Sequence, residues 1–277
     1  MGYVSVMVYV DDVDSANSRI TLACDLAELF EAELIGVSAS LPARPVIGPY
    51  PVGAVMSNAW IEEEKLAEKE VKRAEGRFRS IAGARRSQLV WRAGVCDPAE
   101  FAARQARKAD VIILGPDSGW PRSCNAANPG DVLMAAGRPV FVSPPNCALK
   151  PMLAHVLIAW KDCREARRAV ADSLPLLGKA DKITIVEIAE EADQASNRQS
   201  VEDVADFIRL HGKSATALAI SSNGQSTAKQ ILAYADANGV GLIVLGGYGH
   251  ARTREWIFGG VTRTLLQTSR ICCLFSH

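Results

Sequence analysis

The sequence repeats one apolar segment, and this repeat constrains the fold more than any other feature. The run ADVIILG at residues 109–115 matches the run GLIVLG at residues 241–246 almost residue for residue. Each half also opens with a short, strand-like run, at residues 3–10 and 155–160. Self-similarity of this kind predicts that the chain contains two copies of one structural unit.

Helical patterns alternate with the apolar runs in both copies. A helix is predicted after each opening strand, at residues 15–30 and 164–177. A later pair of equivalent helices is predicted to begin at the caps Asp97, which precedes a proline, and Ser226. Each half therefore follows the order β-α-β-α-β-α-β-α-β, which implies parallel strands, right-handed crossovers and helices on both faces of a sheet.

This order predicts an α/β fold with two tandem domains, at residues 1–146 and 152–277, and a boundary near residues 144–151. Each domain is expected to be an open parallel five-stranded sheet flanked by helices. The last apolar runs, at residues 139–142 and 271–275, would leave sheet edges exposed unless they were paired. We therefore predict that these two runs meet around a pseudo-two-fold axis, so that one chain forms a pseudo-dimer.

Charge and composition exclude several classes of function. Lys plus Arg and Asp plus Glu both number 31, whereas a nucleic-acid binder concentrates cations, so no nucleic-acid partner is expected. The sequence lacks the apolar stretch of about 18 residues that a membrane helix needs and shows no signal peptide, which predicts a cytoplasmic protein without a membrane partner. The chain has seven cysteines, and an odd count in a protein expected to be cytoplasmic argues against a disulfide framework. There is no CxxC pair, and Cys272 and Cys273 are expected to be small buried hydrophobic residues, with redox sensing by this pair as the alternative.

Two glycine clusters follow the repeated strand of the second half. In an open parallel sheet, ligands bind beyond the carboxyl ends of the strands, and this is where the clusters lie. Glycines allow close approach of the backbone to an anion, and a helix start supplies free N–H groups and the positive end of the helix dipole. The alternative is that the glycines only form a turn. The predicted phosphate-binding residues are Gly246, Gly249, His250, Arg252, Gly259, Gly260, Val261 and Thr262.

The spacing GxxG, nine residues, then Gly resembles the nucleotide motif of the universal stress protein superfamily, and the doubled pattern resembles its tandem members. The resemblance implies an adenine nucleotide alpha hydrolase-like fold and a bound ATP or AMP, with or without Mg²⁺. It also implies that an Asp ending the first strand, and backbone of the second strand, hold adenine. Lys161 stands at that Asp position here, and Gly260 stands where the family has Ser or Thr. The residues expected at the adenine end are Ala159, Trp160, Asp162 and Ile188.

The first half keeps the aspartate of the motif but lacks its glycine loop. Asp11 stands where the adenine-contacting Asp belongs, but Pro116 has no N–H to donate and Asp117 would repel phosphate. The segment 128–130, Asn-Pro-Gly, replaces the second glycine cluster. We therefore expect the first half to bind nucleotide poorly or not at all.

Three functions remain open from the sequence. The first is a nucleotide-binding stress-response or regulatory protein with an unidentified protein partner, little or no turnover and the capacity to form a homodimer. The second is a nucleotide-free interaction scaffold, and the third is a slow ATPase or adenylyl-transfer enzyme. The sequence shows no Walker lysine and assigns no catalytic or metal-ligating residue. Among the four histidines, His155 is expected to be structural and His250 to contact phosphate.

Overall fold

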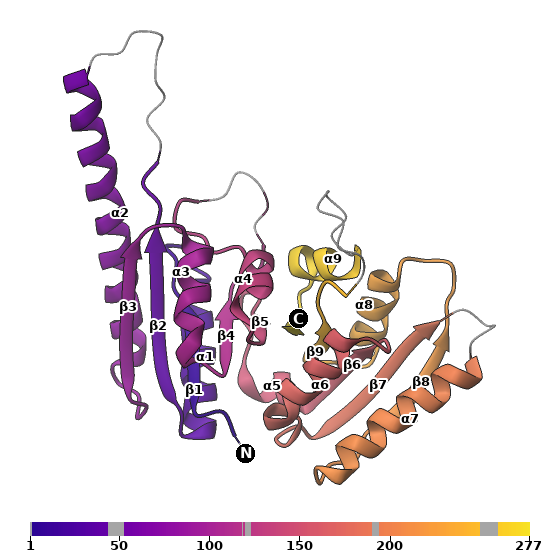
Figure 1. Ribbon diagram of the computed structural model, residues 1–277. Helices are drawn as coiled ribbons and strands as arrows, with labels where there is room; N and C mark the ends of the chain where they lie inside the picture. The colour runs from indigo at the N-terminus through magenta and orange to yellow at the C-terminus, as the bar shows by residue number, and fades with distance from the viewer. Residues whose placement is uncertain (1, 44–52, 118, 120–122, 190–193, 250–259) are drawn as a thin grey trace.

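The computed structural model describes residues 2–43, 53–117, 119, 123–189, 194–249 and 260–277. Within this described part, one ten-stranded sheet runs through the molecule in the order β3-β2-β1-β4-β5-β10-β9-β6-β7-β8. Helices cover both of its faces, and the two halves of the chain lie side by side (Figure 1). The predicted α/β class is confirmed.

The elements alternate in the same order in each half. The N-terminal half contains β1 (Ser5–Tyr9), α1 (Ala16–Phe30), β2 (Glu33–Ser40), α2 (Gly53–Ala82), β3 (Leu89–Val95), α3 (Pro98–Gln105), a 3-10 turn η1 (Ala106–Lys108), β4 (Val111–Leu114), α4 (Pro129–Ala136) and β5 (Val140–Val142). The C-terminal half contains α5 (Leu149–Ala154), β6 (His155–Trp160), α6 (Arg164–Leu177), β7 (Lys182–Ala189), α7 (Gln194–Leu210), β8 (Thr216–Ser221), α8 (Thr227–Ala237), β9 (Leu242–Gly246), α9 (Gly260–Thr268) and β10 (Cys272–Ser276).

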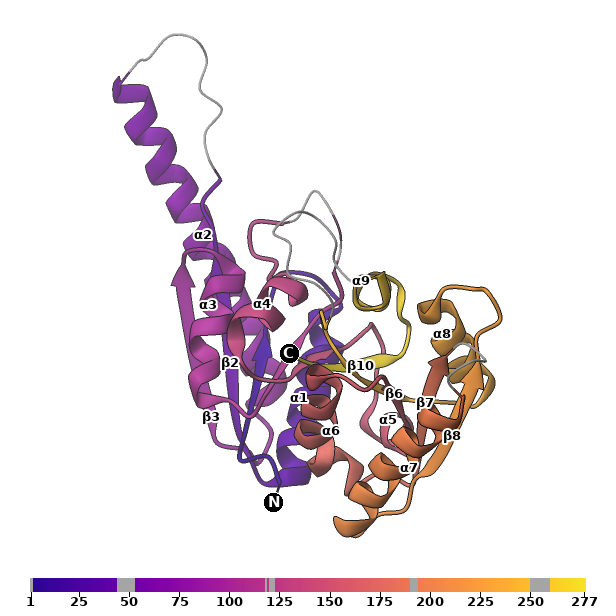
Figure 2. The ribbon, with the colours of Figure 1, turned by 45° about the vertical axis from the view of Figure 1, so that its right-hand side comes forward.

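The first helices of the two halves, α1 and α6, occupy the predicted ranges almost to the residue. The short helix α5 was not predicted, and it fills part of the stretch expected to separate the halves. In α2, the N-terminal part projects past the ends of the strands, as Figures 1 and 2 show from two directions. The Asp97 cap is confirmed, since its side chain accepts a hydrogen bond from the Glu100 N–H, whereas Ser226 occupies a cap position without a side-chain bond.

The two halves join through their last strands. β5 and β10 pair antiparallel, with Phe141 opposite Leu274, while the neighbouring strands within each half are parallel. This pairing confirms the predicted meeting of the two apolar edges. The two expected five-stranded sheets are therefore continuous, because each would otherwise leave a row of unpaired backbone groups in apolar surroundings.

Apolar side chains pack on both faces of the sheet. Helices α1, α2, α6 and α7 contribute to one buried cluster, and α3, α4, α8 and α9 contribute to the other. Strand β7 shows the alternation clearly: Ile183 and Ile185 belong to the first cluster, whereas Val186 and Ile188 pack on the second. Side chains of a strand point alternately to opposite faces, so the next residue on the first face is Glu187.

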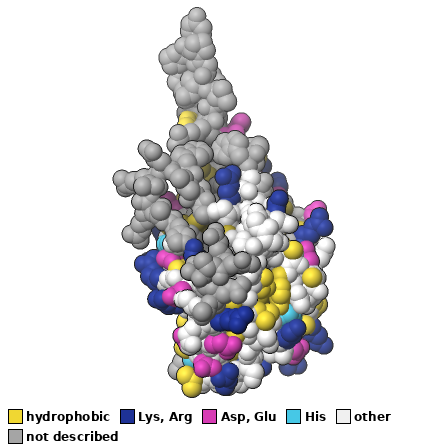
Figure 3. All heavy atoms as spheres, turned by 90° about the vertical axis from the view of Figure 1, so that its right-hand side faces the viewer, with side chains coloured by type: hydrophobic (Ala, Val, Ile, Leu, Met, Phe, Trp, Pro, Cys, Tyr) yellow, Lys and Arg dark blue, Asp and Glu magenta, His cyan; other side chains and the backbone are white. Residues whose placement is uncertain are grey.

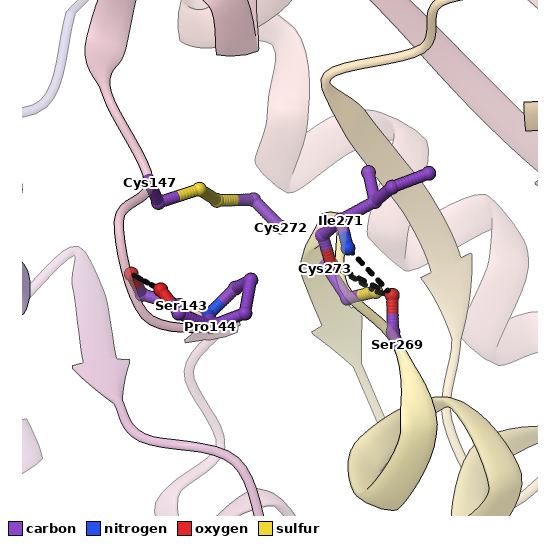
Figure 4. Close-up of a disulfide and its surroundings, with 7 residues drawn as sticks. All are labelled: Ser143, Pro144, Cys147, Ser269, Ile271, Cys272 and Cys273. Carbon is purple, nitrogen blue, oxygen red and sulfur yellow. Dashed lines mark hydrogen bonds between the residues drawn. A yellow bond between two sulfur atoms is a disulfide. The ribbon is translucent and has the colours of Figure 1, made fainter. Parts of the chain in front are cut away.

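A disulfide corrects the expectation from the cysteine count. Cys147, in the segment between β5 and α5, is bonded to Cys272 at the start of β10 (Figure 4). Cys273 remains a buried thiol whose Sγ lies 3.4 Å from Ser269 Oγ, and burial raises its pKa to about 12. Counting cysteines could not reveal the bridge, because only the pairing of β5 with β10 brings residues 125 positions apart together.

Candidate functional site

A cavity of about 480 Å³ lies at the carboxyl ends of β6, β7 and β9, beside the start of α9. Its volume falls in the range of about 300–1,000 Å³ that is usual for small-molecule sites. Eight of the predicted site residues contribute to its lining: Ala159, Trp160, Ile188, Gly246, Gly249, Gly260, Val261 and Thr262. The fold thus gathers residues that are more than a hundred positions apart in the sequence, such as Ala159 and Thr262.

Four predicted residues are not placed at this cavity. Asp162 lies outside the lining, where its carboxylate accepts a hydrogen bond of 3.0 Å from Arg167 Nε on the surface. His250, Arg252 and Gly259 lie outside the described residues. The adenine end expected from the motif therefore lacks both Asp162 and the family aspartate, whose position Lys161 occupies in the cavity wall.

The first glycine cluster has a packing role of its own. A Cβ atom on Gly246 would lie 2.6 Å from the Ala166 N atom and 2.7 Å from the Glu165 carbonyl carbon, so β9 ends directly against the start of α6. A Cβ on Gly249 would lie 3.0 Å from Glu165 Oε2. Gly246 is therefore needed for the fit between β9 and α6 whether or not a ligand is bound, whereas at Gly249 the Glu165 side chain would have to shift.

Two amides of the loop after β9 are already paired with protein atoms. Gly247 N–H donates to the Ser276 carbonyl at 2.8 Å, and Tyr248 N–H donates to Thr262 Oγ1 at 3.3 Å. These two amides are therefore not free to bind an anion, because β10 and α9 pack close enough to accept their hydrogen bonds. The N–H groups of the first turn of α9, which begins at Gly260, have no partner inside the helix. Among the described residues, a Cβ on Gly260 would meet no atom within 4 Å.

Charges of both signs surround the cavity. Lys161 lines it, and the buried Glu165 carboxylate lies beside Gly249. Burial favours the neutral form of Glu165, but its backbone N–H and the Arg164 guanidinium, 2.9 Å away, hold its pKa below the ordinary value for glutamate. An anion placed directly on Gly249 would therefore face a negative charge, which leaves the start of α9 as the more favourable place for phosphate.

Several lining residues were not predicted from the sequence: Cys163, Ala166, Glu187, Asn197, Thr227, Ile231, Leu245 and Tyr248. Glu187 could have been found, because the alternation of β7 places it on the same buried face as Ile183 and Ile185. A carboxylate on such a face is unusual unless it is paired or functional. No pattern in the sequence distinguishes Asn197.

The equivalent cavity of the N-terminal half measures about 190 Å³, and Arg19 forms part of its lining. Arg19 is 2% exposed; its Nη2 atom lies 2.6 Å from Asp11 Oδ1, and its Nε atom donates to the Tyr9 carbonyl at 2.9 Å. A Cβ on Gly115 would collide with the guanidinium. The sequence reasoning overlooked Arg19, although a charged residue within the apolar pattern of α1 was a visible signal.

The broken loop of the N-terminal half contacts the other half instead. Asp117 N–H donates to the Leu266 carbonyl of α9 at 3.0 Å, and Gln267 Nε2 lies 3.3 Å from Asp117 Oδ2. A Cβ on Gly130 would collide with the hydroxyl of Tyr248. The residues that replace the motif in this half therefore serve the interface between the halves.

The described residues hold no group of three or more His, Cys, Asp or Glu side chains that could bind a metal ion. In the same part of the chain, the helices are too short or too polar to span a membrane. Figure 3 shows the outer side of the C-terminal half, where acidic and basic side chains are mixed among the described residues and do not form one wide area of a single charge. This distribution gives no support to nucleic-acid binding.

No family model matches the sequence, and no curated protein matches it. Several solved structures, however, match the structure of the chain. A universal stress protein from Archaeoglobus fulgidus DSM 4304 aligns with a TM-score of 0.72 and 14% identity, over 98% of this chain and 95% of its own. A functionally unknown protein from Pseudomonas aeruginosa PAO1 aligns with a TM-score of 0.57 and 14% identity, over 99% of this chain and 92% of its own. The chain therefore has the fold of a universal stress protein over nearly its whole length.

Proposed function

We propose that the C-terminal half binds an adenine nucleotide, ATP or AMP, and that the protein is a regulatory or stress-response protein of the universal stress protein kind. The cavity beside α9 carries this proposal, because eight of the predicted site residues line it at the edge of the sheet where ligands bind in open α/β folds. The bound nucleotide would bias a surface used by a partner protein or by a second copy of the chain. A cytoplasmic location stays a prediction.

In this proposal, the phosphate groups lie against the first turn of α9. Gly260, Val261 and Thr262 all line the cavity, and the N-terminus of a helix favours an anion through its free N–H groups and its dipole. The base lies toward the ends of β6 and β7, near Trp160 and Ile188. Mg²⁺ would be held through the phosphates and not by a preformed cluster of acidic side chains.

Calorimetric titration with AMP and ATP tests this proposal. Gly260→Asp places a carboxylate at the start of α9, where the residue has room, and is expected to weaken binding at least tenfold by repelling phosphate. Gly260→Ser occupies the same space without a charge and should retain binding. Equal affinity of the two variants would contradict phosphate binding at α9.

A nucleotide-free scaffold is the second candidate function. The paired amides of Gly247 and Tyr248 and the carboxylate of Glu165 favour it, because they reduce the capacity of the loop to hold an anion. Absence of AMP and ATP binding by the wild-type protein, with no nucleotide released on denaturation, would support the scaffold. Phosphate release measured in the same samples would reveal the slow ATPase.

A further inference from the structure

We propose that Glu187 and Asn197 recognise the amino-bearing edge of adenine, in place of the aspartate that ends the first strand in the family motif. The inference rests on the proposed function and goes further, because it names the residues that would select the base. Two polar atoms on the cavity wall carry it. Glu187 Oε2 and Asn197 Nδ2 are shielded from water and have no hydrogen-bond partner among the described residues.

Glu187 is 7% exposed in strand β7. Burial raises its pKa above the ordinary value for glutamate, the Asp162 carboxylate adds to this shift, and the Ser200 hydroxyl and Lys161 partly offset it. A buried acceptor without a donor costs free energy, and so does a buried donor without an acceptor. A ligand that supplies one donor to Glu187 and one acceptor to Asn197 would remove both costs.

Glu187 and Asn197 lie on different elements, β7 and α7, and Trp160 contacts both elements. Trp160 is the ladder partner of Glu187 across β6 and β7, so both side chains lie on the same face of the sheet. The Trp160 indole Nε1 donates to Ser200 Oγ of α7 at 2.8 Å. Asn197 precedes Ser200 by three residues on the same helix, so the two share one face of α7. The acceptor, the donor and an aromatic ring all line the same cavity.

Adenine fits this arrangement. Its N6 amino group donates a hydrogen bond, and a neighbouring ring nitrogen accepts one, which matches Glu187 Oε2 and Asn197 Nδ2. Guanine presents a carbonyl and two kinds of N–H donor at the corresponding edge, and two shielded protein atoms leave one of these groups unmatched. The Trp160 ring supplies an apolar wall, and aromatic rings are common surfaces for nucleobases.

The inference is tested by measuring the affinity of several nucleotides for the wild-type protein and for variants of Glu187 and Asn197. Wild-type protein is titrated with AMP, with purine riboside 5′-monophosphate, which lacks only the N6 amino group, and with IMP and GMP. We expect AMP to bind about tenfold tighter than purine riboside 5′-monophosphate, the effect of one lost hydrogen bond to a buried carboxylate. In Glu187→Met, which removes the acceptor at similar volume, this ratio should fall to about one.

The control is Glu202→Met, the same substitution at an exposed position of α7, which should leave the ratio at its wild-type value. Thermal melting checks that each variant is folded. Asn197→Ala is the second variant: it should weaken AMP while keeping the tenfold preference for the amino group, because Glu187 remains.

The outcomes separate the two proposals. Wild-type protein that binds AMP and purine riboside 5′-monophosphate equally, or that prefers GMP or IMP, overturns the role of Glu187 and Asn197 but leaves nucleotide binding in place. A ratio that stays at tenfold in Glu187→Met also overturns it. Absence of binding for all four nucleotides overturns both proposals.

Discussion

The two halves of the molecule share one order of strands and helices but differ in the cavity at the end of the sheet. In the N-terminal half, the Arg19 guanidinium fills that position and is paired with Asp11. In the C-terminal half, the position eight residues after Lys161 is Ala169, whereas eight residues after Asp11 comes Arg19. The C-terminal cavity has about 480 Å³ and the N-terminal one about 190 Å³.

This difference teaches that one long, buried side chain can occupy a position that the other copy of the same fold leaves as a cavity. The sequence suggested that Pro116 and Asp117 destroy the N-terminal site by removing a donor and adding a negative charge. The structure adds a separate feature of this half: the carboxylate that the motif would assign to adenine is paired with a buried arginine. The same half uses its altered loop to contact α9, the helix at which we propose that phosphate binds in the other half.

Removing Arg19 is expected to have the largest effect of the changes that test the difference between the two halves. Arg19→Ala should lower the free energy of unfolding by about 3–5 kcal/mol, because it leaves the Asp11 carboxylate buried without its partner. Urea denaturation measures the loss. The control is Arg168→Ala, which breaks a pair with Asp172 whose arginine is 52% exposed and should cost less than about 1 kcal/mol. Equal losses of unfolding free energy in the two variants would show that the buried Arg19–Asp11 pair stabilises the fold no more than an exposed ion pair does.

Removing the disulfide tests how much this link between the two unlike halves stabilises the protein. Cys147→Ser should lower stability by about 2–4 kcal/mol, since the bridge closes a loop of 125 positions in the unfolded chain. Wild-type protein under reducing conditions should match the variant in urea denaturation. Identical midpoints for oxidised protein, reduced protein and Cys147→Ser would show that the bridge contributes nothing.

Gly130→Ala tests the contact between the loops of the two halves. The new methyl group would meet the Tyr248 hydroxyl, so we expect a loss of about 1–3 kcal/mol. In the background Tyr248→Phe the hydroxyl is gone, and the same substitution should cost less. A double-mutant cycle by chemical denaturation measures this coupling. Strict additivity would mean that Gly130 serves a purpose other than making room for Tyr248.

The smallest effect is expected at the N-cap residues of α3 and α8, which are equivalent helices in the two halves. Asp97→Ala should cost about 0.5–2 kcal/mol, because Asp97 Oδ1 accepts the Glu100 N–H at 2.8 Å. Ser226→Ala, at the start of α8, should cost only a few tenths of a kcal/mol, because the Ser226 side chain forms no cap bond. Thermal melting of both variants gives the comparison, and a larger loss for Ser226→Ala would reverse it.

Much of the fold followed from local patterns in the sequence. The repeated runs, the span of α6 and the apolar edges at β5 and β10 were all predictable, because strand and helix periodicities depend on residues close together in the chain. The glycine spacing likewise placed the candidate site at the end of β9. These features depend on which side chains need burial and which backbone positions need glycine.

Only the tertiary structure decided which groups meet at that edge. Arg19 with Asp11, Cys147 with Cys272, and Glu187 beside α7 all depend on how helices pack across strands. Asp162 shows the converse, since it is adjacent to the motif position in the sequence but turns to Arg167. A sequence position fixes what a side chain can donate, accept or bury, whereas its partner is chosen by distances that arise only when the elements pack.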